Sequence, residues 1–285
     1  MRYGILGLVL IIALFLSPTF AVASPVAPPS LVIAPRRPFD LSSSSASLNW
    51  AGYALAVTPG TVNFVNGSWI VPKISPSKGT TYVALWVGID GYNDSTVEQT
   101  GILVESKSGN VYYYAWYEFY PSSPVYAPSS DVVKPGDDIS AKVIYLGNDE
   151  YETQLNDTTE GWHYYSPVTT VSGAKDSNAE WIVERPSTIS GLTTLANFGT
   201  AYFGYDYTGI SGTNYAEING KQYTIGAETT GSNPIAITMV SSTGQPLATP
   251  SGLSSDGTSF TVSYVTSASI TSPGGHGHKR TLKDN

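Results

Sequence analysis

A two-residue alternation of side chains is the feature that most limits the fold of this chain. Segments rich in β-branched and aromatic residues recur along its middle, and Gly, Pro, Asn or Asp residues bound them, as in strands separated by turns. No stretch of ten residues shows the period of an amphipathic helix. We therefore expect an all-β fold, an antiparallel β-sandwich of two large sheets. The predicted strands are 67–71, 81–89, 97–105, 111–120, 138–146, 179–184, 235–240 and 260–265.

The connection between two of these strands has the composition of a tight turn. Pro135 fixes its own φ angle and Gly136 tolerates a positive φ, so Lys134-Pro135-Gly136-Asp137 is predicted to reverse the chain. We find neither an internal repeat nor a second domain in the 285 residues. One β-sandwich domain is therefore expected over residues 48–270, although length alone would permit two.

Residues 1–23 have the composition of a secretion signal. Arg2 supplies a positive charge, residues 4–16 are thirteen consecutive apolar or Gly residues, and 21–23 have the small-x-small pattern of a signal-peptidase site. Thirteen residues are too few to span a bilayer, which takes about 20, so an uncleaved anchor is the less favoured alternative. We expect a secreted, extracellular protein without a membrane attachment after cleavage.

The two flanking segments differ from the middle of the chain. Residues 24–47 contain five prolines and a run of serines, which predicts extended, polyproline-like chain rather than a packed element. This segment is interpreted as a linker or a short pro-segment. Arg36 and Arg37 could pair with acidic groups of the domain, which would suit an inhibitory role, but a plain spacer fits equally well. Residues 271–285 are interpreted as a polar disordered tail.

The composition excludes several kinds of chemistry. The chain has no cysteine and three histidines, so thiol nucleophiles, disulfides and thiolate metal sites are ruled out, and we expect neither a metal nor another cofactor. With 22 acidic and 14 basic residues and a net charge of −8, it does not resemble a nucleic-acid binder. A serine hydrolase is poorly supported, because no G-x-S-x-G occurs and His163 is the only histidine of the predicted domain. Carboxylates, amides and aromatic rings remain.

Alternation within the predicted strands gathers aromatic and acidic side chains on one face. Trp86 and Asp90 fall on the same side of their strand, opposite its aliphatic residues. Trp116 and Glu118 share a face of the predicted strand 111–120, and Glu184 ends the predicted strand 179–184, which has a similar pattern. A solvated sheet face normally carries Lys, Thr and Glu, so this one indicates a concave cleft. Ordinary surface aromatics on a sandwich are the plainer alternative.

Four segments of the chain have distinctive compositions. They are Asn49-Trp50-Ala51-Gly52, the run 85–91 followed by Gln99-Thr100-Gly101, the string 115–121, and the string 178–184. They resemble the signature segments of the eqolisins, or glutamic peptidases, in the order of that family and at similar spacing, and the resemblance covers about residues 48–265. Fungal members of the family carry cysteines, which are missing here.

The resemblance implies a sandwich of two antiparallel sheets and an acid-active endopeptidase with a Gln and a Glu as its catalytic pair. By motif position, Gln99 and Glu184 match that pair. Four further residues match positions that bind substrate, line the cleft or support the pair. They are Trp50, Trp86, Asp90 and Glu118.

These side chains suit peptide-bond hydrolysis. Glu184 could take a proton from water and return it to the leaving amine, while the Gln99 amide donates to the developing oxyanion. A carboxamide is neutral at every pH, which avoids the like-charge problem of two paired acids. Because an ordinary Glu titrates near pH 4.3, we expect optimal activity below about pH 5. Glu180 lies on the same face as Glu184 and is the alternative base.

Two other functions share the same features. A glycoside hydrolase could use Glu118 with Asp90 or Glu184, since two carboxylates and stacked aromatics also describe a sugar cleft. A carbohydrate-binding sandwich without catalysis would need only the Tyr and Trp residues. We expect a monomer with protein or peptide substrates and no nucleic-acid partner.

Overall fold

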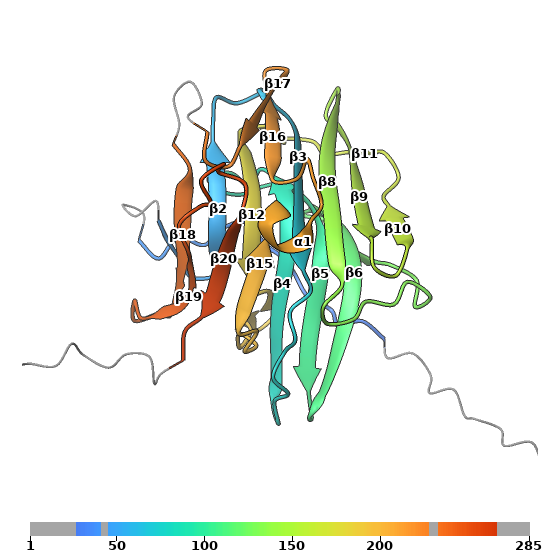
Figure 1. Cartoon of the computed structure of the whole chain (residues 1–285), viewed down its shortest axis with the longest axis vertical. Coiled ribbons are helices and arrows are strands. Elements are labelled where there is room, and N and C mark those ends of the chain that lie inside the picture. Colours follow the sequence, from blue (N-terminus) through green and yellow to red (C-terminus); the bar gives the residue numbers. More distant parts are fainter. Residues whose placement is uncertain (1–26, 41–44, 228–232, 267–285) are drawn as a thin grey trace, which may run out of the picture.

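Nearly all regular structure in the computed structural model, which describes residues 27–40, 45–227 and 233–266, consists of β-strands (Figure 1). The short helix α1 (Tyr205–Thr208) follows the strand β15 (Thr200–Phe203). Within the described ranges, no helix has the length and apolarity that crossing a membrane requires. The predicted all-β class is confirmed.

One sheet, the front sheet, carries the predicted site residues on its strands, except for Asp90, which directly follows one of them. Each strand in it runs antiparallel to its neighbours, and β12 lies between β2 and β4. The strands in spatial order are β18 (Ile235–Val240), β2 (Trp50–Ala56), β12 (Asn178–Glu184), β4 (Thr80–Ile89), β5 (Val97–Lys107), β6 (Asn110–Tyr120) and β7 (Val125–Tyr126).

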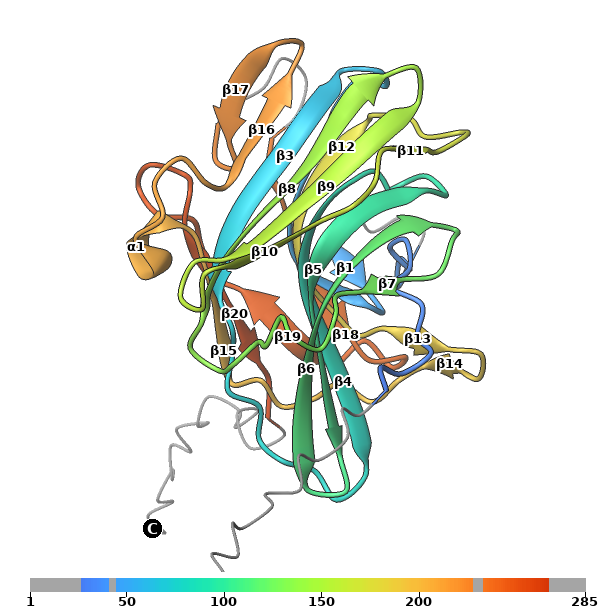
Figure 2. The ribbon, with the colours of Figure 1, turned by 90° about the vertical axis from the view of Figure 1, so that its right-hand side faces the viewer.

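A second sheet, the back sheet, packs behind it, and Figure 2 shows the two layers from the side. Its main strands in spatial order are β19 (Pro246–Pro250), β20 (Phe260–Tyr264), β15 (Thr200–Phe203), β3 (Val62–Ile70), β8 (Asp138–Gly147) and β9 (Glu150–Asp157). β18 pairs with both β2 and β19, so the two sheets are continuous at that edge.

Short strands extend these sheets at their margins. The hairpin of β16 (Tyr215–Ile218) and β17 (Lys221–Thr224) adds to β3, while β10 (Trp162–Tyr165) and β11 (Thr169–Thr170) add to β9. β1 (Ala46–Ser47) runs parallel to β18. The pair β13 (Ser187–Thr188) and β14 (Gly191–Leu192) forms a separate small hairpin.

The main hydrophobic core fills the space between the sheets. Val87 and Trp181 of the front sheet and Val143, Leu155 and Phe203 of the back sheet belong to it, and all five are buried. The predicted alternation is correct in β4. Leu85 and Val87 belong to this core, whereas Trp86 between them belongs to another cluster, on the outer face of the front sheet. The site residues face away from the core.

Each of the eight predicted strands coincides with a strand of the structure, although β3 begins at Val62 rather than at residue 67. The predicted turn is also present. The Asp137 N–H donates to the Lys134 carbonyl over 3.2 Å, the Lys134 N–H donates to Asp137 Oδ2 over 2.6 Å, and Gly136 has a φ of 95°. The turn brings the chain into β8.

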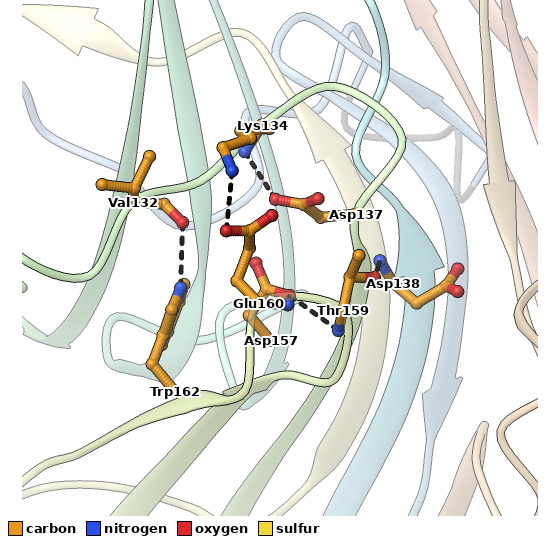
Figure 3. Close-up of polar contacts among 8 residues, drawn as sticks. All are labelled: Val132, Lys134, Asp137, Asp138, Asp157, Thr159, Glu160 and Trp162. Carbon is orange, nitrogen blue, oxygen red and sulfur yellow. Dashed lines mark hydrogen bonds and ion pairs between the residues drawn. The ribbon is translucent and has the colours of Figure 1, made fainter.

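Figure 3 shows how this turn is attached to the end of β9. Lys134 Nζ lies 2.7 Å from Glu160 Oε2, and Trp162 Nε1 donates to the Val132 carbonyl over 2.9 Å. Burial, together with the neighbouring carboxyl of the turn, raises the pKa of Asp157 to about 6. These contacts lie in the back-sheet layer, which contributes none of the predicted site residues.

The N-terminal segment, residues 27–40, differs from what its composition predicts. It is extended, as expected, but it packs against the outer face of the front sheet instead of standing free (Figure 2). Leu31 and Ile33 are 4% and 0% exposed and belong to the cluster on that face. The expectation of an unpacked segment was wrong, because its apolar residues find a binding surface. The predicted signal peptide and C-terminal tail lie outside the described residues.

Gly52 in β2 is a position where a side chain cannot fit. Its φ is 141°, and a Cβ there would lie 2.1 Å from the Trp181 carbonyl oxygen of β12. A strained backbone position typically costs about 1–3 kcal/mol. We predict that Gly52→Ala lowers the free energy of unfolding by more than this, because a backbone clash adds to the strain.

Urea unfolding of the variant measures this effect. Gly60→Ala is the matched control, because Gly60 also has a positive φ of 78° but has open space around it. Equal losses of stability in the two variants would contradict the clash.

Candidate active site

The register of the front sheet brings the predicted catalytic pair onto one face. Gln99 of β5 lies opposite Glu118 of β6 and Gly88 of β4. Glu184 of β12 lies opposite Trp50 of β2 and Ala84 of β4. Gln99 and Glu184 are therefore carried by strands on either side of β4, and both side chains are fully buried.

Glu184 is held by two indole groups. Its Oε2 accepts hydrogen bonds from Trp50 Nε1 over 3.1 Å and from Trp86 Nε1 over 3.0 Å. The two rings are themselves packed edge to face, with centroids 4.9 Å apart. Its Oε1 accepts from the Ala34 N–H over 3.0 Å and lies 3.5 Å from Asn49 Nδ2. These contacts fix the carboxyl in one orientation.

Gln99 uses its amide nitrogen in two directions. Nε2 donates to Glu118 Oε2 over 2.8 Å and to the Ile33 carbonyl oxygen over 2.6 Å. Gln99 Oε1 is buried and has no hydrogen-bond partner among the described residues. Glu118 thus orients the carboxamide, and one amide hydrogen is directed at a peptide carbonyl.

Burial dominates the electrostatics of the two carboxyls. Desolvation raises the pKa of Glu184 well above its usual value, and hydrogen bonds from Ala34, Trp86, Asn49 and Trp50 oppose that effect by stabilising the charged form. Desolvation, followed by repulsion from Glu184, raises the pKa of Glu118. Because each charge disfavours the other, the pair retains a proton to higher pH than two isolated carboxyls would.

A glycine makes room for Trp86. Gly101 of β5 lies opposite Trp86 of β4, and a Cβ there would lie 2.0 Å from the Leu85 carbonyl oxygen and 2.7 Å from the Trp86 Cβ. A side chain at this position would displace β4 or the indole that contacts Glu184. This contact explains the glycine in the Gln-Thr-Gly string of the sequence.

Asp90 lies at the end of β4 and contacts the segment before β12. Its carboxylate accepts hydrogen bonds from the backbone N–H groups of Lys175, Asp176 and Ser177, over 2.5, 2.8 and 2.8 Å. The fully buried Asp90 has a φ of 66°. Asp90 therefore anchors the start of β12, and Glu184 lies at the other end of that strand.

Of the residues predicted from sequence, the structure brings together Trp50, Trp86 and Glu118 with Gln99 and Glu184. The hydrogen bonds of Asp90 go instead to the segment before β12.

Sequence reasoning missed three contributors to this site. Asn49 lies in the quoted Asn-Trp-Ala-Gly string, and its amide contacts Glu184 and the carbonyls of Ala34 and Pro35. Its position directly before Trp50 was the available signal. Ile33 and Ala34 carried none, because they lie in a proline-rich segment.

Three more carboxyls are partly or fully buried near the end of β4. Burial and then the charge of Asp90 raise the pKa of Asp94 to about 6 and raise those of Glu98 and Glu180 well above the usual value. Neither oxygen of Glu98 or Glu180 has a hydrogen-bond partner among the described residues. Among all the residues that the structure describes, no group of three or more His, Cys, Asp or Glu is arranged to hold a metal ion.

Comparisons with known proteins agree on one family. The model of the peptidase A4 family matches residues 48–264. Aspergillopepsin-2 of Aspergillus niger is 31% identical over 182 residues, which are 55% of this chain and 62% of that protein. The chain thus spans less than two thirds of the length of this curated relative.

Two solved structures share the fold. Scytalido-glutamic peptidase, solved with a transition-state analogue inhibitor, superposes with a TM-score of 0.62 at 22% identity and covers 76% of this chain and 98% of its own. Aspergilloglutamic peptidase from Aspergillus niger has a TM-score of 0.55 at 26% identity and covers 65% of this chain and 99% of its own.

The buried carboxyls predict a fold that is most stable in acid. Since Asp94, Glu98 and Glu180 have raised pKa values, the folded chain binds more protons than the unfolded chain, and the free energy of unfolding falls as pH rises. The stabilisation is complete below about pH 4. It is lost as pH rises through the raised values, of which that of Asp94 is about 6.

Melting temperatures measured across this pH range test the prediction. Glu98→Gln and Glu180→Gln should reduce the loss of stability at neutral pH, because a carboxamide cannot ionise. Asp206→Asn, at an exposed position of α1, is the control and should leave the profile unchanged. A melting temperature that rises from acid to neutral pH would contradict the assignment.

Proposed function

This chain belongs to the peptidase A4 family, and on that premise we propose that it is an endopeptidase that hydrolyses peptide bonds with Gln99 and Glu184 as its catalytic pair. One observation carries the proposal. Gln99 donates to the carbonyl oxygen of Ile33, and Glu184 accepts from the N–H of Ala34, so the two side chains contact both ends of one peptide group. The carbonyl oxygen and the nitrogen of a peptide group are the atoms that gain charge and a proton when the bond is hydrolysed.

The chemistry follows from the donor and acceptor character of the pair. Glu184 as carboxylate removes a proton from the attacking water and then transfers it to the leaving nitrogen. Gln99 Nε2 donates to the carbonyl oxygen as negative charge develops there. Gln99 Oε1, which has no described partner, is available to accept a hydrogen bond from that water.

The remaining residues of the site position this pair. Trp50 and Trp86 fix one oxygen of Glu184, and Glu118 fixes the Gln99 amide. Asp90, predicted from sequence among the substrate-binding residues, is proposed here as a positioning residue. Its hydrogen bonds to the segment before β12 support that role.

We extend the proposal to an acidic, extracellular setting. Burial and the charge of Glu184 raise the pKa of Glu118, so Glu118 is neutral in acid and does not repel the Glu184 carboxylate that the reaction needs. The hydrogen bonds from Ala34, Trp86, Asn49 and Trp50 stabilise the charged form of Glu184 and lower its pKa against the effect of burial. The secretion signal predicted for residues 1–23 supports export. Protein or peptide chains are the proposed substrates.

Substitution of either member of the pair tests the proposed function. Gln99→Ala removes one oxyanion donor and is expected to lower kcat by about 10²–10³. Glu184→Gln keeps the shape of the side chain but removes the base, so hydrolysis of an unfolded protein at acidic pH should be lost. Released peptides are measured by mass spectrometry.

The control is Glu152→Gln in β9 of the back sheet, which should retain wild-type activity. Circular dichroism confirms that each variant is folded. Near-native hydrolysis by both pair variants would contradict the proposal, as would release of reducing sugars from a polysaccharide without release of peptides from protein.

Glu118 is predicted to set the upper pH limit of activity. Below its raised pKa, Glu118 is neutral beside the charged Glu184, and above it two like charges share the site. Glu118→Gln mimics the neutral form and keeps an acceptor for Gln99. Its activity should therefore extend to higher pH by about one unit, the lower end of the shift that one nearby charge causes.

Initial rates of peptide hydrolysis across pH measure this limit, in assays short compared with unfolding. Glu152→Gln again provides the comparison. An upper limit in Glu118→Gln that stays at the wild-type pH would assign the limit to another group.

A further inference from the structure

We propose that an apolar cavity at the edge of the front sheet is a remote binding site for protein substrates. It receives a large apolar side chain from the sixth or seventh residue before the bond that is cut. The inference rests on the proposed function and adds two properties to it. One is a preference for long, extended substrates, and the other is a preference for a kind of side chain far from the reacting bond.

The cavity lies between the first half of β6 and the segment 127–133, which follows β7. Its volume is about 460 Å³. Val111, Tyr112 and Tyr114 line it on the side of β6, and Val132 and Val133 line it on the other side. Most of these groups are apolar, and concave apolar sites of this size are where proteins bind apolar parts of a ligand.

The course of the chain after β7 explains why this space is open. The Ala127 N–H donates to the Ala115 carbonyl over 2.9 Å, which continues the pairing with β6 by one residue. The chain then turns, and the Asp131 N–H donates to the Pro128 carbonyl over 2.9 Å. Of the described strands, β7 alone adjoins this edge of β6, and it does not reach the residues before Ala115. That part of the edge therefore faces the cavity.

The outer wall of the cavity is held from behind (Figure 3). The Val132 carbonyl accepts a hydrogen bond from Trp162 Nε1 over 2.9 Å, and Lys134 Nζ lies 2.7 Å from Glu160 Oε2. Val133 is buried in the main core. Val132, in contrast, is 48% exposed. The segment is thus anchored around an apolar residue that has no place in the core, so the cavity exists before a ligand binds.

The N-terminal segment shows a path from the catalytic pair to this cavity. The peptide group 33–34 contacts the pair. Closer to the N-terminus, the Tyr126 hydroxyl donates to the Pro29 carbonyl over 3.0 Å, and Ala27 and Pro28 line the cavity. Pro28 and Ala27 are the sixth and seventh residues before the peptide bond 33–34. An extended substrate with its reacting bond at the pair can place the same positions in the cavity.

The segment reaches the cavity without filling it. Ala27 and Pro28 are both exposed, and the open volume lies beside them. Both have small side chains, so a larger apolar side chain at either position would remove more apolar surface from water, its own and that of Val132. The cavity therefore suits Phe, Leu or Trp better than the residues of this segment.

A contact in this cavity is expected to change KM and not kcat. The cavity contains neither Gln99 nor Glu184. A contact that is equal in the bound substrate and in the transition state strengthens binding without accelerating the chemical step. An unfolded protein supplies the required run of extended chain before the cut bond, whereas a short peptide does not. Unfolded proteins are therefore the substrate class that this site favours.

Three peptides test the site with the full chain at acidic pH. The core peptide contains a bond that mass spectrometry shows to be cut in an unfolded protein, with five residues before it and four after it. The second peptide adds Phe-Phe before the core, and the third adds Ser-Ser. All three meet the same N-terminal segment of the enzyme, so its presence cancels from the comparison.

Phe-Phe should raise kcat/KM by about tenfold over the core peptide, entirely through a lower KM, because it buries a large apolar side chain. Ser-Ser should leave kcat/KM unchanged. Equal values for all three peptides would overturn the proposal, as would a gain that arises in kcat or that Ser-Ser produces equally.

A variant of the cavity wall tests where the gain arises. Val132→Lys places a charge in the wall and should abolish the gain from Phe-Phe, while the core peptide is hydrolysed at the wild-type rate. Val168→Lys is the matched control, because Val168 is 52% exposed and lies outside the cavity, and it should keep the gain. Circular dichroism confirms that both variants are folded. A Val132→Lys chain that keeps the gain, or that loses hydrolysis of both peptides equally, would overturn the proposal.

The core peptide separates this inference from the proposed function. A chain that hydrolyses the core peptide without any gain from Phe-Phe would overturn the remote site and leave the proposed function standing. A chain that hydrolyses neither a peptide nor an unfolded protein would overturn both.

Discussion

The burial of the Glu184 carboxyl is the constraint on which the rest of the site depends. A carboxyl group removed from water is destabilised by several kcal/mol when charged unless hydrogen bonds replace the lost hydration. Two indole N–H groups supply that replacement here, and they need Trp50 and Trp86 at fixed positions on the strands that flank β12. The bare backbone at Gly101 allows one of these rings to lie against the sheet.

The second member of the proposed pair has a different requirement. A carboxamide carries no charge, so its burial requires only that its polar atoms find partners. Glu118 and the peptide carbonyl of Ile33 provide them for the nitrogen. Glu184 thus responds to pH and Gln99 does not. The pH dependence of the site therefore comes from its carboxyl groups.

The sequence predicted the face of each strand but not how the strands meet. Alternation correctly separated Trp86 from the aliphatic residues of β4, because the pleat is a local property of the backbone. Register between β12 and β4 joins residues about a hundred positions apart, and only the resemblance to a family related Glu184 to Gln99 before the fold was known.

Other parts of the fold were missed, and for some of them the physical reason is clear. The strand β2 contains Gly52 and several alanines, which are poor strand formers, and β9 alternates with polar residues that composition assigns to loops. Packing of the proline-rich segment was hidden because its buried residues, Leu31 and Ile33, gain their apolar surroundings only from the assembled sheet. Local composition carries no information about a distant binding surface.

One strand belongs to both layers, and this has a consequence for how the molecule comes apart. Since Ile235–Ile237 of β18 pair with β2 and the following Met239 and Val240 pair with β19, loss of β18 removes an edge strand from each layer at once. Neither layer can then detach as an independent unit through that side. Denaturation is therefore expected as one concerted transition, without a half-open species that would present an unpaired edge to neighbouring molecules.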